Sequence, residues 1–319
     1  MKAIHPEGFI LRHPDFRTTK IHNGKVITIG PGERWGVDGH EKLTLIGFSI
    51  YGIRDAWGKI LRFQVVPNAR NEQIVDYVFL LTVQEAGGVP LTVTSDKGTE
   101  TGGIFARQTS LRALFAPEID PDVLPAYISI RSVRNIIIER SWSVLLKKVG
   151  RNLKAMWEQS VVTAGFVEGN VLHRALADWI WVPLAQDYIN DFVNTYNNHK
   201  VRRQPHKQGP SNAAHNYTYQ FPEEFGGENQ LVYGDMDLVA QILQDHPGKE
   251  AIRFYPPWFD VLCQESHRRI GRPPLTLASA WLVFVHMLVP VSVAVSALGE
   301  GGLRELVREV EPADREEYY

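Results

Sequence analysis

Two strand-like runs and one helix-like run follow one another directly in the chain: LTLIGFSIYGI (43–53), KILRFQVV (59–66) and NEQIVDYVFLLTVQEAGG (71–88). The first two are rich in β-branched and aromatic residues, which predicts neighbouring antiparallel strands. The third has the length of a helix, with Asn71 as a suitable N-cap and Gly87 where a left-handed residue commonly ends a helix. A strand pair followed by a covering helix predicts a layered α/β domain.

The alternation of strands and helices continues on both sides. The segment WGVDGHE (35–41) predicts a further strand in front. Behind, PLTVTSD (90–96) and AYISI (126–130) predict strands, and GTETGGIFARQTSLRALF (98–115) predicts the helix between them. With another helix starting near Arg134, this order of elements predicts a mixed α/β layer arrangement.

The helix that starts near Arg134 separates apolar from basic side chains. A helical wheel predicts a buried stripe of Ile138, Trp142, Leu145, Val149, Leu153 and Met156. The opposite, basic face gathers Arg140, Lys147, Arg151 and Lys154, with Glu139 at the border. Lys147, Arg151 and Lys154 form either a contact to the DNA backbone or an ordinary solvated helix face.

A second basic cluster follows the next helical stretch. The run VLHRALADWIWVPLAQDYINDFVNTY (171–196) is helical and aromatic, and we expect Pro183 to interrupt it. The segment NHKVRRQPHKQGPSN (198–212) contains no acid and carries Lys200, Arg202, Arg203 and Lys207. It is the best candidate for a nucleic-acid patch, and nuclear import is a competing use of the same charges.

The composition excludes several classes of protein. Of the 319 residues, 44% are hydrophobic and 22% are charged, which is typical of an ordered globular chain. Lys and Arg total 34 against 36 for Asp and Glu, so the formal charge is −2 and any polyanion site must be local. The single cysteine, Cys263, excludes an internal disulfide and a Cys2His2 zinc finger, which indicates an intracellular protein.

One long run carries no formal charge: LTLASAWLVFVHMLVPVSVAVSAL, from Leu275 to Leu298. It is long enough to span a bilayer, but His286, Pro290 and several Ser and Thr residues dilute its hydrophobicity. A pair of helices packed on a domain gives the same pattern. We therefore expect a buried helical hairpin here and keep membrane attachment as the alternative.

Three acidic residues stand at informative places: Asp38 in the first strand, Asp96 at the end of TVTSD, and Glu139 on the helix NIIIERSW. Acids on neighbouring strands and on a helix packed across them can converge on hard cations, which prefer oxygen ligands. That is the layout of a two-metal site for in-line phosphodiester chemistry. Taken singly, each acid has a plainer interpretation: a turn residue, a helix cap or a surface ion pair.

His40 is expected on the same strand face as Asp38. It either contacts a phosphate or a metal-bound water, or makes a structural hydrogen bond. The sequence offers no convincing Gly-rich phosphate loop, Ser-His-Asp order or cysteine nucleophile, so no organic cofactor is expected.

Five motifs, in this order, carry a resemblance to a known family: GPGERWGVDGHEKL, GFSIYGIRDAWGKIL, TSDKGTE, RSVRNIIIERSW and YNNHKVRRQPHKQGPSN. Over roughly residues 30–215 the chain resembles the integrase core domain proteins of fungi and animals, relatives of retroviral integrases and DDE transposases. The resemblance implies a ribonuclease-H-like mixed five-stranded sheet, flanked by helices and followed by a mostly helical C-terminal extension. It also implies that Asp38, Asp96 and Glu139 are catalytic carboxylates that hold two Mg²⁺ or Mn²⁺ ions when DNA is bound.

The expected organisation and activity follow from this resemblance. Residues 1–30 form a lead-in and 31–165 the catalytic core. Residues 166–250 form a helical extension with the basic segment, and 251–319 a C-terminal segment of unclear role with an acidic tail. The expected activity is DNA strand cleavage and transfer by a transposon-derived, Mg²⁺-dependent polynucleotidyl transferase that works in the nucleus as a homo-oligomer.

Departures from the family pattern support an alternative function. Ile136 and Ile137 replace the usual Gln-Arg pair of the catalytic helix, and Trp57 and Gly58 replace the Ser-Arg of a Ser-Arg-Lys run. Retroviral relatives carry lysines at the positions of Ser143 and Leu146. The alternative is a domesticated, catalytically weakened DNA-binding protein that retains the integrase fold.

Overall fold

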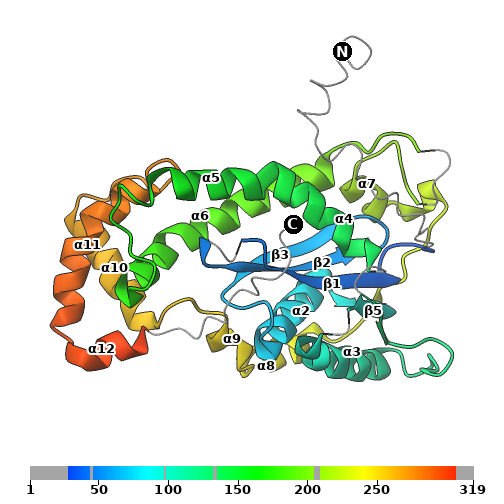
Figure 1. The fold of residues 1–319 in the computed structure, drawn as a ribbon. Helices are drawn as coiled ribbons and strands as arrows, with labels where there is room; N and C mark the ends of the chain where they lie inside the picture. Colours follow the sequence, from blue (N-terminus) through cyan, green and yellow to red (C-terminus); the bar gives the residue numbers. More distant parts are fainter. Residues whose placement is uncertain (1–27, 44–45, 97, 132–134, 205–208, 307–319) are drawn as a thin grey trace, which may run out of the picture.

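The centre of the molecule is a sheet (Figure 1). A computed structural model describes residues 28–43, 46–96, 98–131, 135–204 and 209–306. Within these residues one five-stranded sheet contains β1 (Arg34–His40), β2 (Ser49–Asp55), β3 (Ile60–Val66), β5 (Thr92–Ser95) and β6 (Tyr127–Ser129). Each strand overlaps one of the five segments for which the sequence predicts a strand.

The strand order is β3-β2-β1-β5-β6, and the pairing is mixed. β1, β2 and β3 are antiparallel neighbours, whereas β1, β5 and β6 run parallel to one another. Parallel neighbours need a crossover connection, and α3 (Gly102–Phe115) supplies the one between β5 and β6. The expected mixed five-stranded sheet is therefore confirmed.

One face of the sheet is covered by α2 (Glu72–Ala86) and α3, and α8 (Met236–Gln244) and α9 (Gly248–Ala251) pack against α2. The predicted caps of α2 are both present. The Asn71 side chain accepts the N–H of Ile74, and Gly87 adopts a left-handed conformation with φ of 76°. Short strands β4 (Gly88–Val89) and β7 (Val232–Tyr233) pair beside this layer.

The other face is covered by α4 (Ile136–Leu145), a π-helical turn (Leu146–Gly150), α5 (Arg151–Ser160) and α6 (Val171–Asn198). The predicted apolar stripe is buried from Ile138 to Leu153, but Met156 is 38% exposed and Trp157 is buried in its place. The π-helical turn explains this correction, because it absorbs one extra residue and rotates the side chains that follow.

Helix α6 continues through Pro183, so the expected interruption is wrong. A proline inside a helix removes one helical hydrogen bond and costs about 3 kcal/mol. Packing on both sides of the proline offsets this cost, because Leu176 and Ile180 before it and Ala185 and Ile189 after it are buried. Tertiary burial here overrides the local preference.

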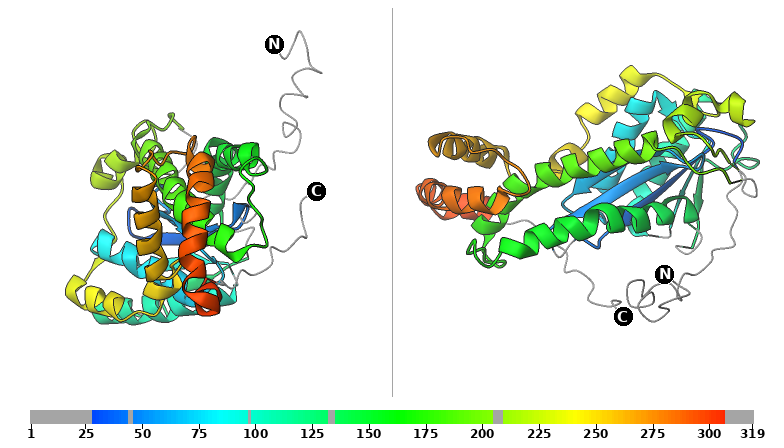
Figure 2. Two further views of the ribbon diagram at one scale, coloured as in Figure 1. Left: turned by 90° about the vertical axis from the view of Figure 1, so that its left-hand side faces the viewer. Right: turned by 90° about the horizontal axis from the view of Figure 1, so that it is seen from above.

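Helices α10 (Pro257–Arg269), α11 (Ala280–Ser296) and α12 (Gly299–Glu305) lie beyond one end of the sheet (Figure 2), and α10 and α11 extend the hydrophobic core there. α7 (His215–Gln220) contacts α6, and α10 and α11 pack against each other and against α6. The core therefore joins the sheet to the C-terminal helices, while the division of the chain near residues 165 and 250 stays a prediction. Most of the lead-in (1–27) and the end of the tail (307–319) lie outside the described residues.

The uncharged run from Leu275 to Leu298 forms one helix, α11, rather than the expected hairpin of two. The second helix of the pair is α10, which lies outside that run. One side of α11 is buried through Trp281, Phe284, Met287, Val291 and Val295, and the other side exposes Leu282, Val285, Val289 and Val293. Among the described residues, no helix has the length and hydrophobicity needed to cross a membrane.

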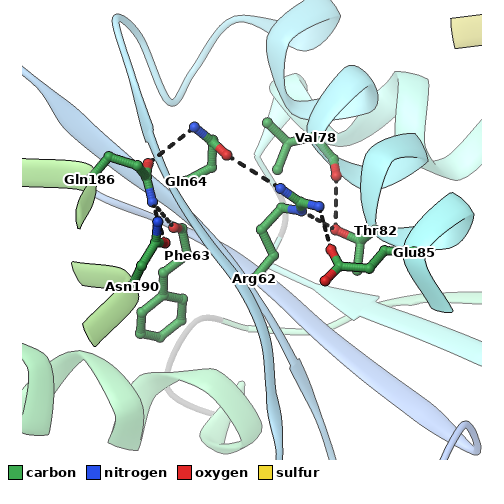
Figure 3. Close-up of polar contacts among 8 residues, drawn as sticks. All are labelled: Arg62, Phe63, Gln64, Val78, Thr82, Glu85, Gln186 and Asn190. Carbon is green, nitrogen blue, oxygen red and sulfur yellow. Dashed lines mark hydrogen bonds and ion pairs between the residues drawn. The ribbon is translucent and has the colours of Figure 1, made fainter. Parts of the chain in front are cut away.

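Side-chain amides of α6 close the open edge of the sheet at β3 (Figure 3). The Gln186 amide nitrogen donates to the carbonyl of Phe63 at 2.9 Å, and its oxygen accepts the N–H of Val65 at 2.7 Å. Asn197 accepts the N–H of Ile60 at 3.0 Å and donates to the carbonyl of the same residue at 2.8 Å. Because an open edge strand tends to pair with other chains, these amides take the place of a further strand.

Replacing Asn197 by Ala should leave the N–H and C=O of Ile60 buried without partners. We expect the free energy of unfolding to fall by about 2 kcal/mol, because a buried unpaired polar group costs roughly 1–3 kcal/mol. Urea denaturation followed by circular dichroism measures this change. Asn194→Ala is the matched control, since Asn194 is exposed on the same helix. An equal loss of stability in both variants would contradict the role assigned to Asn197.

Candidate active site

Asp38 lies in the middle of β1, at the centre of the sheet, and not in a turn. On one side it pairs with Gly52 of β2. On the other side β1 runs parallel to β5, with Gly36 opposite Thr94. Asp96 follows Thr94 by two residues, as Asp38 follows Gly36, so the register brings both acids to the same level of neighbouring strands.

The first turn of α4 brings the third acid to this part of the sheet. The Asn135 side-chain amide donates to the carbonyl of Val37 at 3.1 Å, which fixes the start of α4 on β1. A Cβ atom at Gly36 would lie 2.9 Å from the Ile137 side chain, so the absence of a side chain permits this close approach. Glu139 is exposed in the same first turn.

Asp96 and Glu139 lie close enough to Asp38 for their charges to raise its pKa. Burial is the largest cause that raises the pKa of Asp38 from 3.8 to about 7, and the charges of Asp96 and Glu139 raise it further. Hydrogen bonds from Trp142 and from the Gly39 backbone act in the opposite direction. The fold thus concentrates negative charge around one partly buried carboxylate.

The donor chemistry of this group fits a hard divalent cation. Mg²⁺ prefers carboxylate oxygens, and a cation placed among the acids would stabilise the buried Asp38 carboxylate and relieve its repulsion from Asp96 and Glu139. In the described part of the chain, however, no three His, Cys, Asp or Glu side chains are gathered closely enough to hold one ion together. Asp38, Asp96 and Glu139 would therefore have to move closer to share an ion.

Trp142, on α4, lies against the Asp38 carboxylate. Its indole N–H donates to Oδ2 of Asp38 at 2.8 Å. The rings of His40 and Phe63 stack on the indole, with centroids 4.8 Å and 4.6 Å away. A Cβ atom at Gly52 would lie only 2.4 Å from the indole, so the glycine opposite Asp38 makes room for this ring.

His40 lies on the same side of β1 as Asp38, since both contact Trp142. It is 5% exposed, and its Nε2 has no hydrogen-bond partner within the described residues. Burial, together with the charge of Lys42, lowers the pKa of His40 to about 4, so the ring is neutral near pH 7. The observed role is stacking, and a contact to phosphate or metal-bound water stays a prediction.

Asp96 leads from the end of β5 into the turn before α3. Its Oδ1 accepts the N–H of Gly98 at 3.2 Å within this turn. The plainer interpretation of Asp96 as a helix-entry cap is wrong, because Gly98 is the N-cap of the short 3-10 helix and Thr101 is the N-cap of α3. Glu100 is a further acid beside it, because burial and the Asp96 charge both raise the Glu100 pKa. Glu100 is the last residue of the TSDKGTE motif but is not among the predicted site residues.

Lys147, Arg151 and Lys154 lead away from the carboxylates. They follow Glu139 by 8, 12 and 15 residues along α4, the π-helical turn and α5. At 1.5 Å per residue this places them roughly 12–22 Å further along the helix. Lys147 and Arg151 are exposed, and Lys154 pairs with Glu158 at 3.6 Å. Their contact with DNA stays a prediction.

The basic segment after α6 is anchored near the start of α7. Lys200 pairs with Ala214 in an isolated β-bridge, and the backbones of Val201 and Ala213 are hydrogen-bonded at 2.9 Å. Arg202 and Arg203 are exposed between these contacts. Lys207 lies outside the described residues.

Arginine side chains connect this segment to the candidate site. Arg54 of β2 donates to the carbonyl of Ile137 at 2.7 Å and to the hydroxyl of Tyr196 at 3.0 Å, which links the first turn of α4 to the end of α6. His215, the first residue of α7, stacks on Tyr196. Burial, and then the charges of Arg54 and Arg140, lower the pKa of His215 to about 4. The start of the basic region therefore borders the helix that carries Glu139.

Sequence reasoning missed two side chains that hold the site together. It placed Trp142 in the core stripe, which is correct, but the partner of its N–H lies in a distant strand. Arg54 was not noticed, although a cation in an otherwise apolar strand is a signal for a buried partner. Neither contact can be derived from local periodicity.

The fold and the site together define a class of protein: a ribonuclease-H-like domain with acids on β1, after β5 and on the first turn of α4. Residues 26–220 match the family described as integrase core domain. This match covers more than half of the chain, which therefore belongs to the integrase core domain family and to the superfamily of polynucleotidyl transferases. Domains of this family interact with DNA in general and typically use divalent metal ions. No curated protein matches the chain with significant similarity.

In buffer with a chelator, the Asp38→Asn variant should be more stable than the wild type, and this advantage should grow as the pH rises. The folded-state pKa of about 7 lies above the unfolded value of 3.8, so this group costs the wild type stability as pH rises through that window. Asparagine carries no charge and retains an acceptor for Trp142. We expect the difference in unfolding free energy between variant and wild type to grow by on the order of 2 kcal/mol from pH 5 to pH 8.

Urea denaturation at pH 5, 6.5 and 8 measures this difference. The matched control is Asp122→Asn, because Asp122 is exposed. A stability difference for Asp38→Asn that stays constant across these pH values would contradict the raised pKa of Asp38.

Proposed function

We propose that the protein is a transposon-derived, divalent-metal-dependent polynucleotidyl transferase that cleaves and joins DNA strands. The observation that carries the proposal is the grouping of Asp38, Asp96 and Glu139 in an integrase core domain. The charges of Asp96 and Glu139 act on Asp38, although the three residues come from separate elements. A carboxylate whose pKa is strongly raised by burial and by neighbouring acids, as that of Asp38 is, is typical of functional sites.

Asp38, Asp96 and Glu139 would hold two Mg²⁺ or Mn²⁺ ions when DNA is bound. The ions would activate a water or a 3′-hydroxyl and stabilise the leaving oxygen of the phosphodiester. Asp38 is fixed in the middle of the sheet, whereas Asp96 follows the end of a strand and Glu139 is exposed on a first helical turn. We therefore infer that Asp96 and Glu139 move toward Asp38 when ions and DNA bind.

The DNA backbone would follow the basic side chains near this site. Arg202 and Arg203 are exposed, and Arg140 adjoins Glu139 and influences His215 beside the basic segment. Phosphate contacts of this kind supply affinity without sequence preference. A nuclear location and a homo-oligomeric state remain predictions that accompany a DNA substrate and the family resemblance.

The alternative function, a domesticated DNA-binding protein with weakened catalysis, is favoured by two observations. Ile137, which replaces a polar or basic residue of the family pattern, is only 7% exposed and packs on Gly36. In addition, burial is the largest cause that raises the pKa of Asp38 to about 7, which leaves the carboxyl partly protonated at neutral pH. Both features reduce the number of charged side chains available for catalysis.

The purified protein should nick supercoiled plasmid in Mn²⁺ or Mg²⁺, and a chelator should stop the reaction. Asp96→Asn should lower the rate roughly 100-fold or more, because it removes one ligand of the ions. DNA affinity should persist or rise, since a negative charge is lost. Agarose gels measure nicking and fluorescence polarisation measures binding.

Asp122→Asn is the matched control for this experiment, because it removes an exposed carboxylate outside the site. Equal nicking by wild type and Asp96→Asn would refute the proposed metal site. A wild type that binds DNA but is as inactive as the variant would instead favour the domesticated binding protein.

Replacing Arg202 and Arg203 together by Ala should weaken DNA binding about equally for all sequences. If each side chain contacts one phosphate, the slope of log affinity against log salt should fall by about 2. Fluorescence polarisation at several salt concentrations measures the slope. Arg268→Ala with Arg269→Ala is the charge-matched control on α10, where both arginines pair with Glu265. The same change of slope in both double variants would show that only total charge matters.

A further inference from the structure

The contact between Trp142 and Asp38 is more constrained than an ordinary side-chain hydrogen bond. The indole is 6% exposed, and the stacked rings of His40 and Phe63 restrict its position. Gly52 leaves the space that the indole fills. The N–H on Oδ2 of Asp38 is therefore a fixed donor, and it fixes the carboxylate in turn.

We propose that Trp142 is a positioning residue that orients the Asp38 carboxylate for binding of a divalent cation. This inference rests on the metal site of the proposed function and adds a residue to it. The indole offers one N–H and no acceptor, so it can hold the carboxylate but cannot itself bind the ion. Groups that orient metal ligands in this way commonly contribute a factor of 10–100 to metal affinity.

The orientation of Asp38 also has a consequence for ion selectivity. Ca²⁺ is often coordinated by both oxygens of one carboxylate, whereas Mg²⁺ requires a near-octahedral arrangement of fewer ligands. Because Oδ2 already accepts the indole N–H, Asp38 is poorly placed to chelate an ion through both oxygens. Trp142 therefore favours small octahedral ions such as Mg²⁺ and Mn²⁺ over Ca²⁺.

The chain contains a matched control for this interaction. Trp179 on α6 also donates its indole N–H to an aspartate, Oδ1 of Asp260, at the same distance of 2.8 Å. Its exposure of 8% is close to the 6% of Trp142, and both indoles belong to the same hydrophobic core. The Trp179 contact lies between α6 and α10, away from the three carboxylates. Replacing either tryptophan by phenylalanine removes a similar volume and the same donor.

The experiment is a Mn²⁺ titration of the full-length wild type, Trp142→Phe and Trp179→Phe, with and without duplex DNA. The electron paramagnetic resonance signal of free Mn²⁺ reports binding, and displacement by Ca²⁺ reports selectivity. Thermal unfolding confirms that each variant is folded. We expect the Mn²⁺ dissociation constant to rise about 10-fold in Trp142→Phe and to change less than about twofold in Trp179→Phe. Ca²⁺ should displace Mn²⁺ more readily from Trp142→Phe than from wild type.

The outcomes separate this inference from the proposed function. If wild type binds Mn²⁺ and Trp142→Phe binds it equally well, Trp142 has no positioning role and the metal site stands. If both tryptophan variants weaken binding alike, the effect is one of general packing, and the inference is again wrong. If wild type binds no Mn²⁺ even with DNA, the metal site itself fails, and the role of Trp142 fails with it.

Discussion

The site depends on how closely helix α4 approaches the centre of the sheet. Gly36 on β1 and Gly52 on β2 lie under this helix, and a Cβ atom at either position would collide with Ile137 or with Trp142. These two missing side chains let one helix place both a carboxylate, Glu139, and an indole beside Asp38. A shift of the helix away from the sheet would separate all of these groups together, since interiors this closely packed tolerate little displacement.

Much of the architecture is encoded locally and was predicted from the sequence. The caps of α2 at Asn71 and Gly87 are signals that span a few residues, and the alternation of apolar runs indicated each strand. Local patterns also predicted that Asp38 lies in a strand and Asp96 at the end of one. The level that the two acids share, in contrast, comes from the parallel register of β1 and β5, which pairs segments far apart in the chain. Local patterns were not enough to predict that register or how the acids are held.

What the sequence did not reveal depends on contacts between distant segments. Trp142 and Asp38 are 104 residues apart, and Asn197 and Ile60 are 137 apart, so no periodic pattern relates them. Trp157 is buried where Met156 was predicted to be, because a π-helical turn precedes them. Such a turn depends on tertiary packing more than on composition. Helix α6 likewise continues through Pro183 because the core holds it on both sides. In each case a local preference yields to burial that only the folded chain supplies.

The charged side chains around the site form an acidic group and a neighbouring basic group. Asp38, Asp96 and Glu139 supply the negative side, and Arg54 and Arg140 belong to the positive side, which continues toward the basic segment. His40 stacks on the Trp142 ring that bonds Asp38, and His215 lies near Arg54 and Arg140. The lowered pKa of each histidine keeps it neutral near pH 7. Because both histidines are neutral, their titration does not alter the separation of acidic and basic charges near pH 7. A polyanion held by the arginines would meet the carboxylates only if cations compensated their charge, which is the condition that a metal-dependent phosphodiester site requires.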